Sequence, residues 1–553
     1  MKWVCDFETT TDTKDCRVWL WGAKQIGGPM FFHDVTISSF IEWCSCHCGD
    51  TIYFHNAKFD TEFIYYYLFT NGWKHIIDDK DKRKNTFITL ISDQGIYYST
   101  RLYFTRYDYI NIYDSYKILP FKVEKIAHDF GLEESKLDID YDKPRPLGYE
   151  PTEHELHYLY NDCDIIATVL KEIFELGLTE MTQGSDALKD FKNTIGGNKV
   201  FKRLFPILPI LVDGEIRKSY KGGWTFCNPK YQGKAVGAGM VLDVNSLYPS
   251  VLYNKMLPTG QPVKFQGRYE YDELYPLYTQ RFICRFTIKD NYFPCVQLKN
   301  TLRFTPTEYL CCDDGSPIEL TMTNIDLKLF LDHYDVEIIE YLDGWKFRAS
   351  NDIFKEYIDK WMKVKQENKN TNRSLYIFAK LMLNALYGKF GLKPQVRSKY
   401  PYLKDDGSIG YHRGEDELRD PIYIPIATFT TAYAREITIR AAQSLHNRFL
   451  YADTDSLHIL GDKVPDNLEV HPTKLGCWDL EKHFTRAKFL HAKCYIEESE
   501  GKIDATIAGL PENAKVEVTW KNFKPGATFK GKLIPSHVPG GIVLEPIAFT
   551  IKI

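Results

Sequence analysis

The chain contains 553 residues, 44% of them hydrophobic and 15% aromatic, which is enough for several packed domains rather than one. No run of about 18 apolar residues occurs, which argues against a transmembrane helix, and the polar sequence after Met1 argues against a secretory signal. The 13 cysteines show no disulfide spacing, as expected in a reducing cytosol, and the formal net charge of -4 leaves nucleic-acid binding open because opposite local charges cancel.

Residues 1–185 alternate strand-like and helical stretches. Strands are predicted over residues 3–7, 52–54 and 110–113 from their apolar and β-branched composition. A helix is predicted from Glu153 to Leu176, because Thr152 can cap its first turn and Gly177 suits its end. This alternation is typical of an α/β domain.

Two acidic residues share one face of the first predicted strand. Strand alternation places Asp6 and Glu8 on one face and apolar side chains on the other. Carboxylates about 7 Å apart can share one metal ion or bind two. Such pairs are common on protein surfaces, so this pair indicates a metal site only together with further acids.

Later segments supply those acids. Asp60 lies just past a buried-looking strand at a helix start, and Tyr158 and Asp162 lie four residues apart on one helical face. There a carboxylate can hold a metal ion while the phenol orients a water molecule. Lys136, between these segments, could meet a phosphate.

These segments resemble the three exonuclease motifs of the DnaQ-like proofreading domains: Asp6-Phe7-Glu8-Thr9, Asn56-x-x-Phe59-Asp60 and Tyr158-x-x-x-Asp162. The resemblance implies a ribonuclease H-like 3′-to-5′ exonuclease with two divalent metal ions. The implied catalytic residues are the metal ligands Asp6, Glu8, Asp60 and Asp162, with Tyr158 at the attacking water and Lys136. The implied DNA contacts are His55, Asn56, Phe59, Ser115, Tyr116 and Phe121.

A second unit is predicted from about residue 235. Its strand over residues 239–243 ends in Asp243, and Ser246 can cap the helix that follows. An acid beside a helix N-terminus suits a metal ion carrying a triphosphate, although most such corners are ordinary turns. A hairpin between apolar residues carries Asp453 and Asp455 at its tip, so these acids are expected to face something cationic.

A predicted helix that ends at Gly388 presents polar side chains in one stripe. Lys380, Asn384 and Tyr387 are spaced i, i+4 and i+7, away from the apolar positions. A lysine, an amide and a phenol in line can contact the phosphates, sugar and base of one nucleotide. Alone, such a stripe is more often a solvated face.

Together these segments resemble the motifs of family B DNA polymerases: Asp243-x-x-Ser246-Leu247-Tyr248-Pro249, Lys380-x-x-x-Asn384-x-x-Tyr387-Gly388 and Tyr451-x-Asp453-Thr454-Asp455-Ser456. The resemblance implies a palm, fingers and thumb around two Mg²⁺ ions, for which Mn²⁺ can substitute. The implied metal-site residues are Asp243, Val244 and Asp455, with Asp453 in support. The implied nucleotide-binding residues are Ser246, Leu247, Tyr248, Lys365, Lys380, Asn384 and Tyr387.

Smaller features resemble the protein-primed branch, whose polymerases start synthesis on a hydroxyl of a terminal protein. Tyr220-Lys221-Gly222-Gly223 is similar to that branch's link between the exonuclease and polymerase domains, and two further segments are similar to its primer-holding motifs. The implied DNA contacts are Tyr220, Gly222, Gly223, Thr431, Arg435, Lys493 and Tyr495. The resemblance also implies strand displacement and high processivity.

The expected architecture is a multidomain α/β and α+β protein. We expect an exonuclease domain at 1–185, a linker at 186–234 and a polymerase domain at 235–553. The expected polymerase parts are the palm (235–264, 341–352 and 421–465), a first insertion (265–340), fingers (353–392), a second insertion (393–420) and a thumb with the C-terminal part (466–553). By the resemblance, the insertions contact the terminal protein and encircle DNA.

The expected partners are primer-template DNA, single-stranded DNA, deoxynucleoside triphosphates and a terminal protein. The chain would act as a monomer or as a heterodimer with that protein, without a membrane, in the cytoplasm of a host cell of bacterial type. Alternative functions are a stand-alone exonuclease, which leaves the later motifs idle, and a non-catalytic scaffold, which has no need of all seven carboxylates. A reverse transcriptase typically has adjacent aspartates where this chain has Asp453-Thr454-Asp455. A zinc site at Cys44-Ser45-Cys46-His47-Cys48 is a further alternative, although the spacing is not Cys-x-x-Cys.

Overall fold

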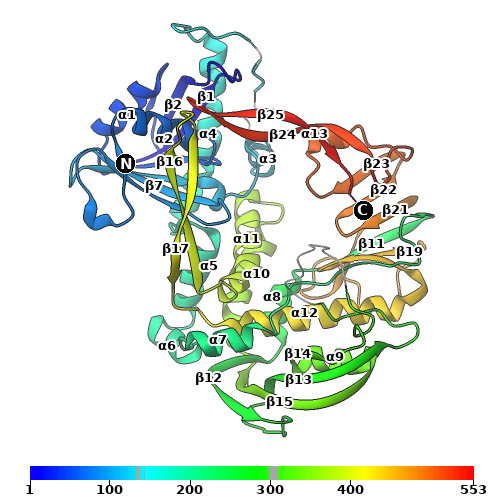
Figure 1. Cartoon of the computed structure of the whole chain (residues 1–553). Coiled ribbons are helices and arrows are strands. Elements are labelled where there is room, and N and C mark those ends of the chain that lie inside the picture. Colours follow the sequence, from blue (N-terminus) through cyan, green and yellow to red (C-terminus); the bar gives the residue numbers. More distant parts are fainter. Residues whose placement is uncertain (133–136, 142, 298–308, 553) are drawn as a thin grey trace.

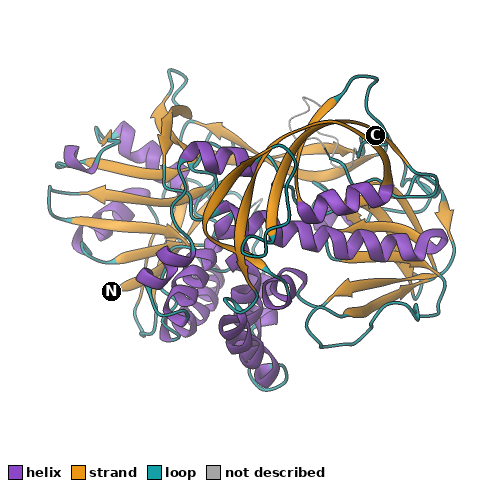
Figure 2. Cartoon of the chain, turned by 90° about the horizontal axis from the view of Figure 1, so that it is seen from below, coloured by secondary structure: helices purple, strands orange, loops and turns teal. Residues whose placement is uncertain are grey.

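The computed structural model describes residues 1–132, 137–141, 143–297 and 309–552 of the chain. Figure 1 shows several sheets joined by helices, and Figure 2 shows that most helices lie between strand-rich regions on either side. In the described part of the chain, no helix is long and apolar enough to cross a membrane.

The N-terminal unit is built on an eight-stranded sheet with the order β3-β2-β1-β4-β8-β7-β6-β5. Strands β1, β4 and β8 are parallel, and the flanking strand pairs are antiparallel apart from β5 and β6. The strands are β1 (Lys2–Thr9), β2 (Val18–Gln25), β3 (Phe31–Asp34), β4 (Thr51–Phe54), β5 (Lys74–His75), β6 (Thr86–Ile91), β7 (Tyr97–Tyr103) and β8 (Tyr109–Asp114). The α/β domain predicted from the sequence is therefore confirmed.

Helices cover both faces of this sheet. One face packs on α1 (Ile37–Cys46) and α2 (Asp60–Thr70), and the other packs on α3 (Val123–Asp129) and α4 (Glu153–Glu175). The predicted start of α4 is confirmed, because Thr152 forms a capping box with Glu155. Within α1, Cys44 points into the core whereas Cys46 is exposed. Among the described residues, no His, Cys, Asp or Glu group could hold a metal ion at this helix, so the zinc alternative finds no support.

An antiparallel sheet, which we call the central sheet, lies in the second half of the chain with the order β20-β11-β19-β18-β9. Its strands are β9 (Thr225–Cys227), β11 (Gly239–Val244), β18 (Phe449–Asp453), β19 (Ser456–Leu460) and β20 (Trp478–Phe484). The largest apolar core packs against it. The surrounding helices are α5 (Gln183–Thr194), α6 (Asn198–Leu204), α7 (Ile210–Arg217), α8 (Leu247–Asn254), α10 (Lys355–Asn368), α11 (Arg373–Phe390) and α12 (Ile424–Leu445).

Two local expectations in this region are wrong. Helix α11 runs through Gly388 and is capped at Gly391, because its hydrogen bonds continue for a further turn. Ser246 precedes α8 in a left-handed conformation with φ 54° and makes no side-chain cap, so its hydroxyl is available for another contact. The predicted stripe of α11 is confirmed in part: Lys380 and Asn384 are exposed and Met382 and Leu383 between them are buried, but Tyr387 is half-buried.

Two further sheets complete the chain. The β12–β15 sheet has the order β12-β15-β13-β14, and its members are β12 (Leu257–Gln266), β13 (Leu277–Ile288), β14 (Ile318–Thr323) and β15 (Tyr334–Ser350), with α9 (Asn324–His333) packed beside them. The C-terminal sheet has the order β10-β21-β22-β23, and its members are β10 (Ala235–Val236), β21 (Arg486–His491), β22 (Cys494–Ser499) and β23 (Lys502–Ile507). A short helix, α13 (Glu512–Lys515), follows.

Two long hairpins reach the N-terminal unit from different directions (Figure 1). They are β16 (Gln395–Leu403) with β17 (Ile409–Leu418), and β24 (Thr528–Val538) with β25 (Gly541–Thr550). Both meet at Glu62 of α2: the Tyr411 hydroxyl donates to its carboxylate at 2.6 Å, and the His537 ring lies 3.3 Å from it. The hairpins thus link the second half of the sequence back to the N-terminal unit.

Candidate functional sites

The N-terminal unit gathers four carboxylates from three elements. Asp6 and Glu8 come from β1, Asp60 is the first residue of α2, and Asp162 lies in the middle of α4. All four line one cavity of about 640 Å³. Parallel strands end at the same sheet edge, which explains how residues far apart in sequence meet here.

Burial gives these acids an unusual electrostatic environment. Glu8, Asp60 and Asp162 are only 4–5% exposed. Burial and then the charge of Asp6 raise the pKa of Asp60 well above its ordinary value. Divalent cations prefer oxygen ligands and would offset this crowded negative charge, so the donor set fits Mg²⁺ or Mn²⁺. Within the described residues, no three acids already stand in a metal-binding arrangement, so side chains would have to adjust around a cation.

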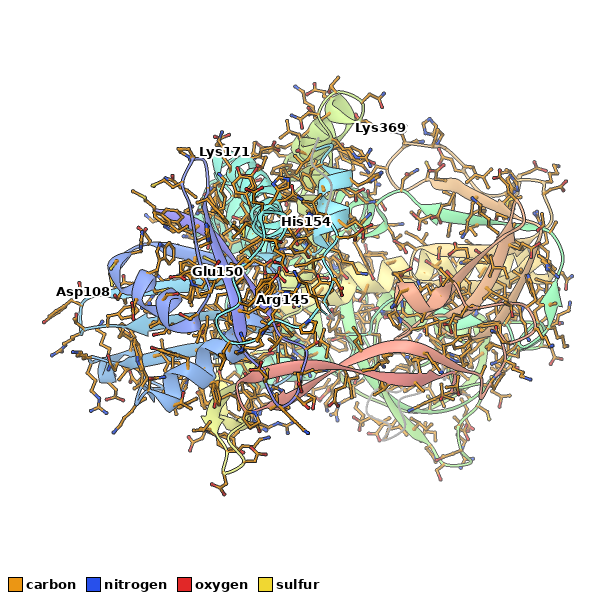
Figure 3. All side chains as sticks on the ribbon, turned by 90° about the horizontal axis from the view of Figure 1, so that it is seen from above. Asp108, Arg145, Glu150, His154, Lys171 and Lys369 are labelled. Atoms are coloured by element: carbon orange, nitrogen blue, oxygen red, sulfur yellow. The ribbon has the colours of Figure 1, made fainter. Side chains whose placement is uncertain are left out.

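A tyrosine pair closes one side of this cavity. Tyr158 of α4 and Tyr141 hydrogen-bond through their hydroxyls at 2.8 Å. The loop that carries Tyr141 is fixed by Arg145, which is buried, pairs with Glu155 at 3.0 Å and lies over the Trp19 ring. Figure 3 shows Arg145 and His154 at this end of α4. The predicted Lys136 lies outside the described residues.

The predicted DNA contacts of this unit lie next to the carboxylates. A second cavity of about 660 Å³ is lined by His55, Asn56 and Tyr116, and it shares His55 and Asn56 with the carboxylate cavity. The His55 ring contacts the Ser115 hydroxyl at 3.0 Å and the Phe121 carbonyl at 2.7 Å. Ser115 is fully buried, so it orients His55 and offers no surface of its own to DNA.

The β24–β25 hairpin forms part of the wall of the carboxylate cavity. Its contributing residues are Leu533, Ile542, Val543 and Leu544, and Phe59 of the N-terminal unit lines the same cavity. The hairpin is anchored there because Cys16 donates to the Ile542 carbonyl and Gly541 packs closely on the Phe63 ring. Sequence analysis missed this contact, since nothing in the local pattern of a C-terminal hairpin indicates a partner in the N-terminal unit.

The second site lies on the central sheet. Asp243 is the second-last residue of β11, and Asp455 occupies the two-residue turn between β18 and β19. The two segments are tied together because the main-chain N–H of Val244 donates to the Asp455 carbonyl at 2.8 Å. Thr454, the other turn residue, has a φ of 64°, which a tight two-residue hairpin requires.

Asp243 and Asp455 also repel each other electrostatically. Burial, the charge of Asp455 and then that of Glu481 raise the pKa of Asp243 to about 7. The pKa of Asp455 is raised as well, chiefly by burial. This oxygen-rich donor set fits a divalent cation for the same reason as the first. Glu481 of β20 is a residue that sequence analysis missed, because it belongs to none of the motifs.

Residues predicted to bind the nucleotide surround these acids. The Lys365 ammonium lies 3.4 Å from the Ser246 hydroxyl, and burial followed by the nearby Lys380 charge lowers the pKa of Lys365. The rings of Tyr248 and Tyr387 stack with centroids 4.0 Å apart. Lys380 and Asn384 stand on the exposed stripe of α11, and Leu247 is buried as the first residue of α8. Figure 3 shows Lys369, which lies between α10 and α11, at the outer end of these two helices.

The linker motif at Tyr220–Gly223 contacts the turn that carries the acids and the C-terminal end of α11. A side chain at Gly223 would collide with Thr454, and one at Gly391 would collide with the Tyr220 hydroxyl. The Thr225 hydroxyl then donates to Asp453 at 3.0 Å. The linker therefore lies directly against the turn that carries the acids.

Arg435 of α12 supports the linker from inside, and Thr431 lies buried one turn earlier in the same helix. The buried Arg435 guanidinium donates to the carbonyls of Lys221 and Gly222 at 2.8 and 2.7 Å and pairs with Asp326. Thr431 is buried too and bonds within its helix. Both side chains are buried, and Arg435 holds the main chain of the linker in place.

The chain matches known proteins over its whole length. The family model described as DNA polymerase type B, organellar and viral, matches residues 137–470. The DNA polymerase of Bacillus phage Nf is 45% identical, with 99% of each chain covered, and that of Bacillus phage phi29 is 43% identical, with 99% of this chain and 98% of the phage protein covered. A solved structure of phi29 DNA polymerase with primer-template DNA and incoming nucleotides has a TM-score of 0.94 at 42% identity and full coverage of both chains. The chain therefore belongs to the family B DNA polymerases, in the protein-primed phage-type group, and is a DNA-directed DNA polymerase.

Proposed function

We propose that this polymerase copies DNA at the Asp243–Asp455 site and removes misplaced 3′ nucleotides at the N-terminal carboxylate site. The observation that carries the proposal is the presence of two separate acidic sites, one on the central sheet and one in the N-terminal cavity. Its biological role is to replicate a linear viral-type genome from a terminal-protein primer in a host cell. That last part rests on membership of the protein-primed group.

At the polymerase site, Asp243 and Asp455 hold the divalent ions, with the main chain of Val244 beside them and Asp453 in support. Bound there, Mg²⁺ or Mn²⁺ ions supply the charge that offsets the negative phosphates during phosphoryl transfer. Lys365, which lies beside the Ser246 hydroxyl, and Lys380 attract the triphosphate because both side chains are cationic.

The sugar and base are held by the neighbouring aromatic and amide groups. Tyr248, stacked against Tyr387, excludes a ribose 2′-hydroxyl, and Tyr387 faces the nascent base pair. Asn384 is one helical turn before Tyr387 on the exposed stripe and contacts the same nucleotide. Leu247 and Ser246 contribute main-chain groups at the start of α8.

At the exonuclease site, Asp6, Glu8, Asp60 and Asp162 are the metal ligands, and Tyr158 orients the attacking water. Tyr141 holds the Tyr158 hydroxyl in place. The 3′ end of a single strand enters past His55, Asn56, Phe59 and Tyr116, where the aromatic rings can stack on bases. In this proposal the Lys136 side chain contacts a phosphate of that strand.

We propose a division of the chain into domains that keeps most of the expected layout. The exonuclease domain is 1–185, the linker 186–234 and the polymerase domain 235–553, with α10 and α11 as fingers and the central sheet as palm. Because β20 (Trp478–Phe484) pairs with β11 in the central sheet, the thumb begins after β20 and not at residue 466 as expected from the sequence. Solved structures of phi29 DNA polymerase contain primer-template DNA or single-stranded DNA, and we propose the same ligands here. The primer strand passes Lys493 and Tyr495, and Tyr220, Gly222 and Gly223 guide the template.

One labelling experiment tests both activities. A primer labelled at its 5′ end and annealed to a longer template is incubated with Mg²⁺, with and without the four deoxynucleotides. We expect lengthening with nucleotides and shortening without them. Lengthening without any shortening would refute the exonuclease. Priming is tested separately with a candidate terminal protein, labelled deoxynucleotide and no DNA primer, where absence of a labelled protein would contradict that step.

The β16–β17 hairpin is proposed to enclose DNA and to support strand displacement. It is held on the N-terminal unit by Tyr411 at Glu62 and by the Arg397 carbonyl, which accepts from the Asp93 N–H at 2.8 Å. Replacing residues 395–418 with a short glycine linker should abolish long products and spare short extension. Long products of unchanged length would contradict this role.

A further inference from the structure

A buried charged group lies where the central sheet meets the C-terminal sheet. Hairpin β18–β19 carries Asp453 and Asp455, and it packs against strand β22, which follows Lys493. The ring of Tyr451 lies 5.1 Å from that of Tyr495 across this boundary. Figure 1 shows β19, β22 and β21 gathered in this region.

Glu497 is the centre of that group. It is 1% exposed, and its two carboxylate oxygens meet His458 at 2.6 Å and Lys482 at 3.0 Å. The three residues come from three strands, since Glu497 lies on β22, His458 on β19 and Lys482 on β20. The Lys482 ammonium also pairs with Asp504 of β23 at 2.5 Å. The network therefore spans both sheets.

The neighbours of Glu497 offset the cost of burying its carboxylate. Burial alone would raise the pKa of Glu497, but His458 and Lys482 outweigh it and hold the pKa below its ordinary value. Well-packed apolar residues at such a place are often as stable as an ion pair. A buried ionic network can add specificity instead, because the Glu497 carboxylate lies within ion-pair distance of both His458 and Lys482 in this alignment of the strands.

That alignment sets the position of Lys493. The Lys493 main-chain N–H donates to the Tyr451 hydroxyl at 2.8 Å, and its ammonium pairs with Asp453 at 2.8 Å. Tyr495 and Glu497 are two residues apart on β22 and so face the same side, toward the central sheet. A shift of β22 would move Lys493 away from Asp453.

We propose that Glu497 is a positioning residue for nucleotide incorporation. Its contacts to His458 and Lys482 fix the strand that follows Lys493 against the Asp453–Asp455 turn. A DNA primer whose backbone rests on Lys493 is thereby aligned with the carboxylates. The inference rests on the proposed placement of the polymerase site, because it names what orients the primer there.

The test compares Glu497→Ala and Glu497→Gln in single-turnover nucleotide incorporation on primer-template DNA. The matched control is Glu498→Gln, on the same strand, whose carboxylate pairs with Arg486 at 2.8 Å and accepts from the Trp520 indole N–H at 2.6 Å, both inside the C-terminal part. The amplitude of the burst gives the fraction of folded, active enzyme, and the rate per active molecule is reported separately. Loss of folding therefore lowers the amplitude and leaves that rate unchanged.

We expect Glu497→Ala to lower the rate per active enzyme by about 10- to 100-fold, the range seen when groups that orient a metal ligand are removed. The nucleotide concentration for half-maximal rate should change less than about twofold, because the nucleotide-binding lysines lie on other elements. Glu497→Gln keeps an acceptor for His458 and should recover the rate to within about threefold of the wild type. Glu498→Gln should stay within about twofold.

A double-mutant cycle completes the test. If Glu497 acts through Lys493, Glu497→Ala should cost little more in a Lys493→Ala background. Additive losses, a normal rate per active enzyme in Glu497→Ala, or equal loss in Glu498→Gln would overturn the proposal. Asp455→Asn is run alongside: its failure to reduce incorporation would overturn the proposed site itself, whereas its success with a normal Glu497→Ala rate would overturn only the positioning role.

Discussion

The two acidic sites of this chain are built in different ways. The N-terminal acids come from a strand and two helices and sit deep in a cavity whose wall includes a hairpin from the far end of the sequence. The acids of the central sheet lie on β11 and on the adjacent β18–β19 turn, which a main-chain hydrogen bond joins, and the exposed Lys380 stands on α11. The first arrangement suits a single-stranded end that must be threaded in. The second suits a duplex end and a nucleotide that arrive from an open side.

The difference also shows how the sites can be linked. The linker motif touches Thr454 between Asp453 and Asp455, and the hairpin that walls the N-terminal carboxylate cavity belongs to the same C-terminal part as Lys493. Contacts from the C-terminal part therefore reach both acidic sites.

The largest effect should come from removing a palm acid. Asp455→Asn removes a negative ligand and should reduce nucleotide incorporation by at least about 10³-fold, because little else in the site can offset the phosphate charge. Single-turnover incorporation measures this. Shortening of a labelled single strand should stay within about twofold of the wild type. Equal loss of both activities would show that the two sites are not independent.

The corresponding substitution in the N-terminal site should have a nearly equal effect. Asp60→Asn should lower 3′-end shortening by about 10³-fold and leave incorporation intact. Because burial and Asp6 raise the pKa of Asp60, the neutral amide should also raise the melting temperature of the metal-free protein at neutral pH. Calorimetry in a chelator checks this second effect, and a lower melting temperature would contradict the crowding of charge in that cavity.

The smallest effect concerns pH. The folded-state pKa of Asp243 is raised to about 7. A raised carboxyl pKa contributes stability that is present below the unfolded value and is lost as pH rises through the folded value. In a chelator, the wild type should therefore lose roughly 1–2 °C more than Asp243→Asn between pH 5 and pH 8. Parallel melting curves would contradict the electrostatic account of the palm acids.

The sequence predicts those parts of the sites that depend on local pattern. The strand that carries Asp243, the hairpin tip with Asp455 and the capped helix α4 all follow from periodicity and capping. Contacts between distant segments were not predictable, as with Val543 in the exonuclease cavity. Glu481 also gave no signal, because its role comes from strand pairing beside Asp243 rather than from a motif.

Some local expectations failed for physical reasons. Ser246 looked like a helix cap, but the turn before α8 needs a left-handed residue, and its hydroxyl faces Lys365 instead. Arg435 looked like a DNA contact, yet the linker carbonyls and Asp326 occupy its guanidinium. In both cases tertiary contacts changed what a side chain does without changing the element that carries it.

The most direct test of the two-site account is correction of a mismatch by one enzyme molecule. A labelled primer with a mismatched 3′ nucleotide is bound to the enzyme, and then Mg²⁺, all deoxynucleotides and excess unlabelled DNA are added together. We predict extended products in which the mismatch has been replaced in the wild type, and products that retain it or stay short in Asp60→Asn. Corrected products from Asp60→Asn at the wild-type yield would contradict the account.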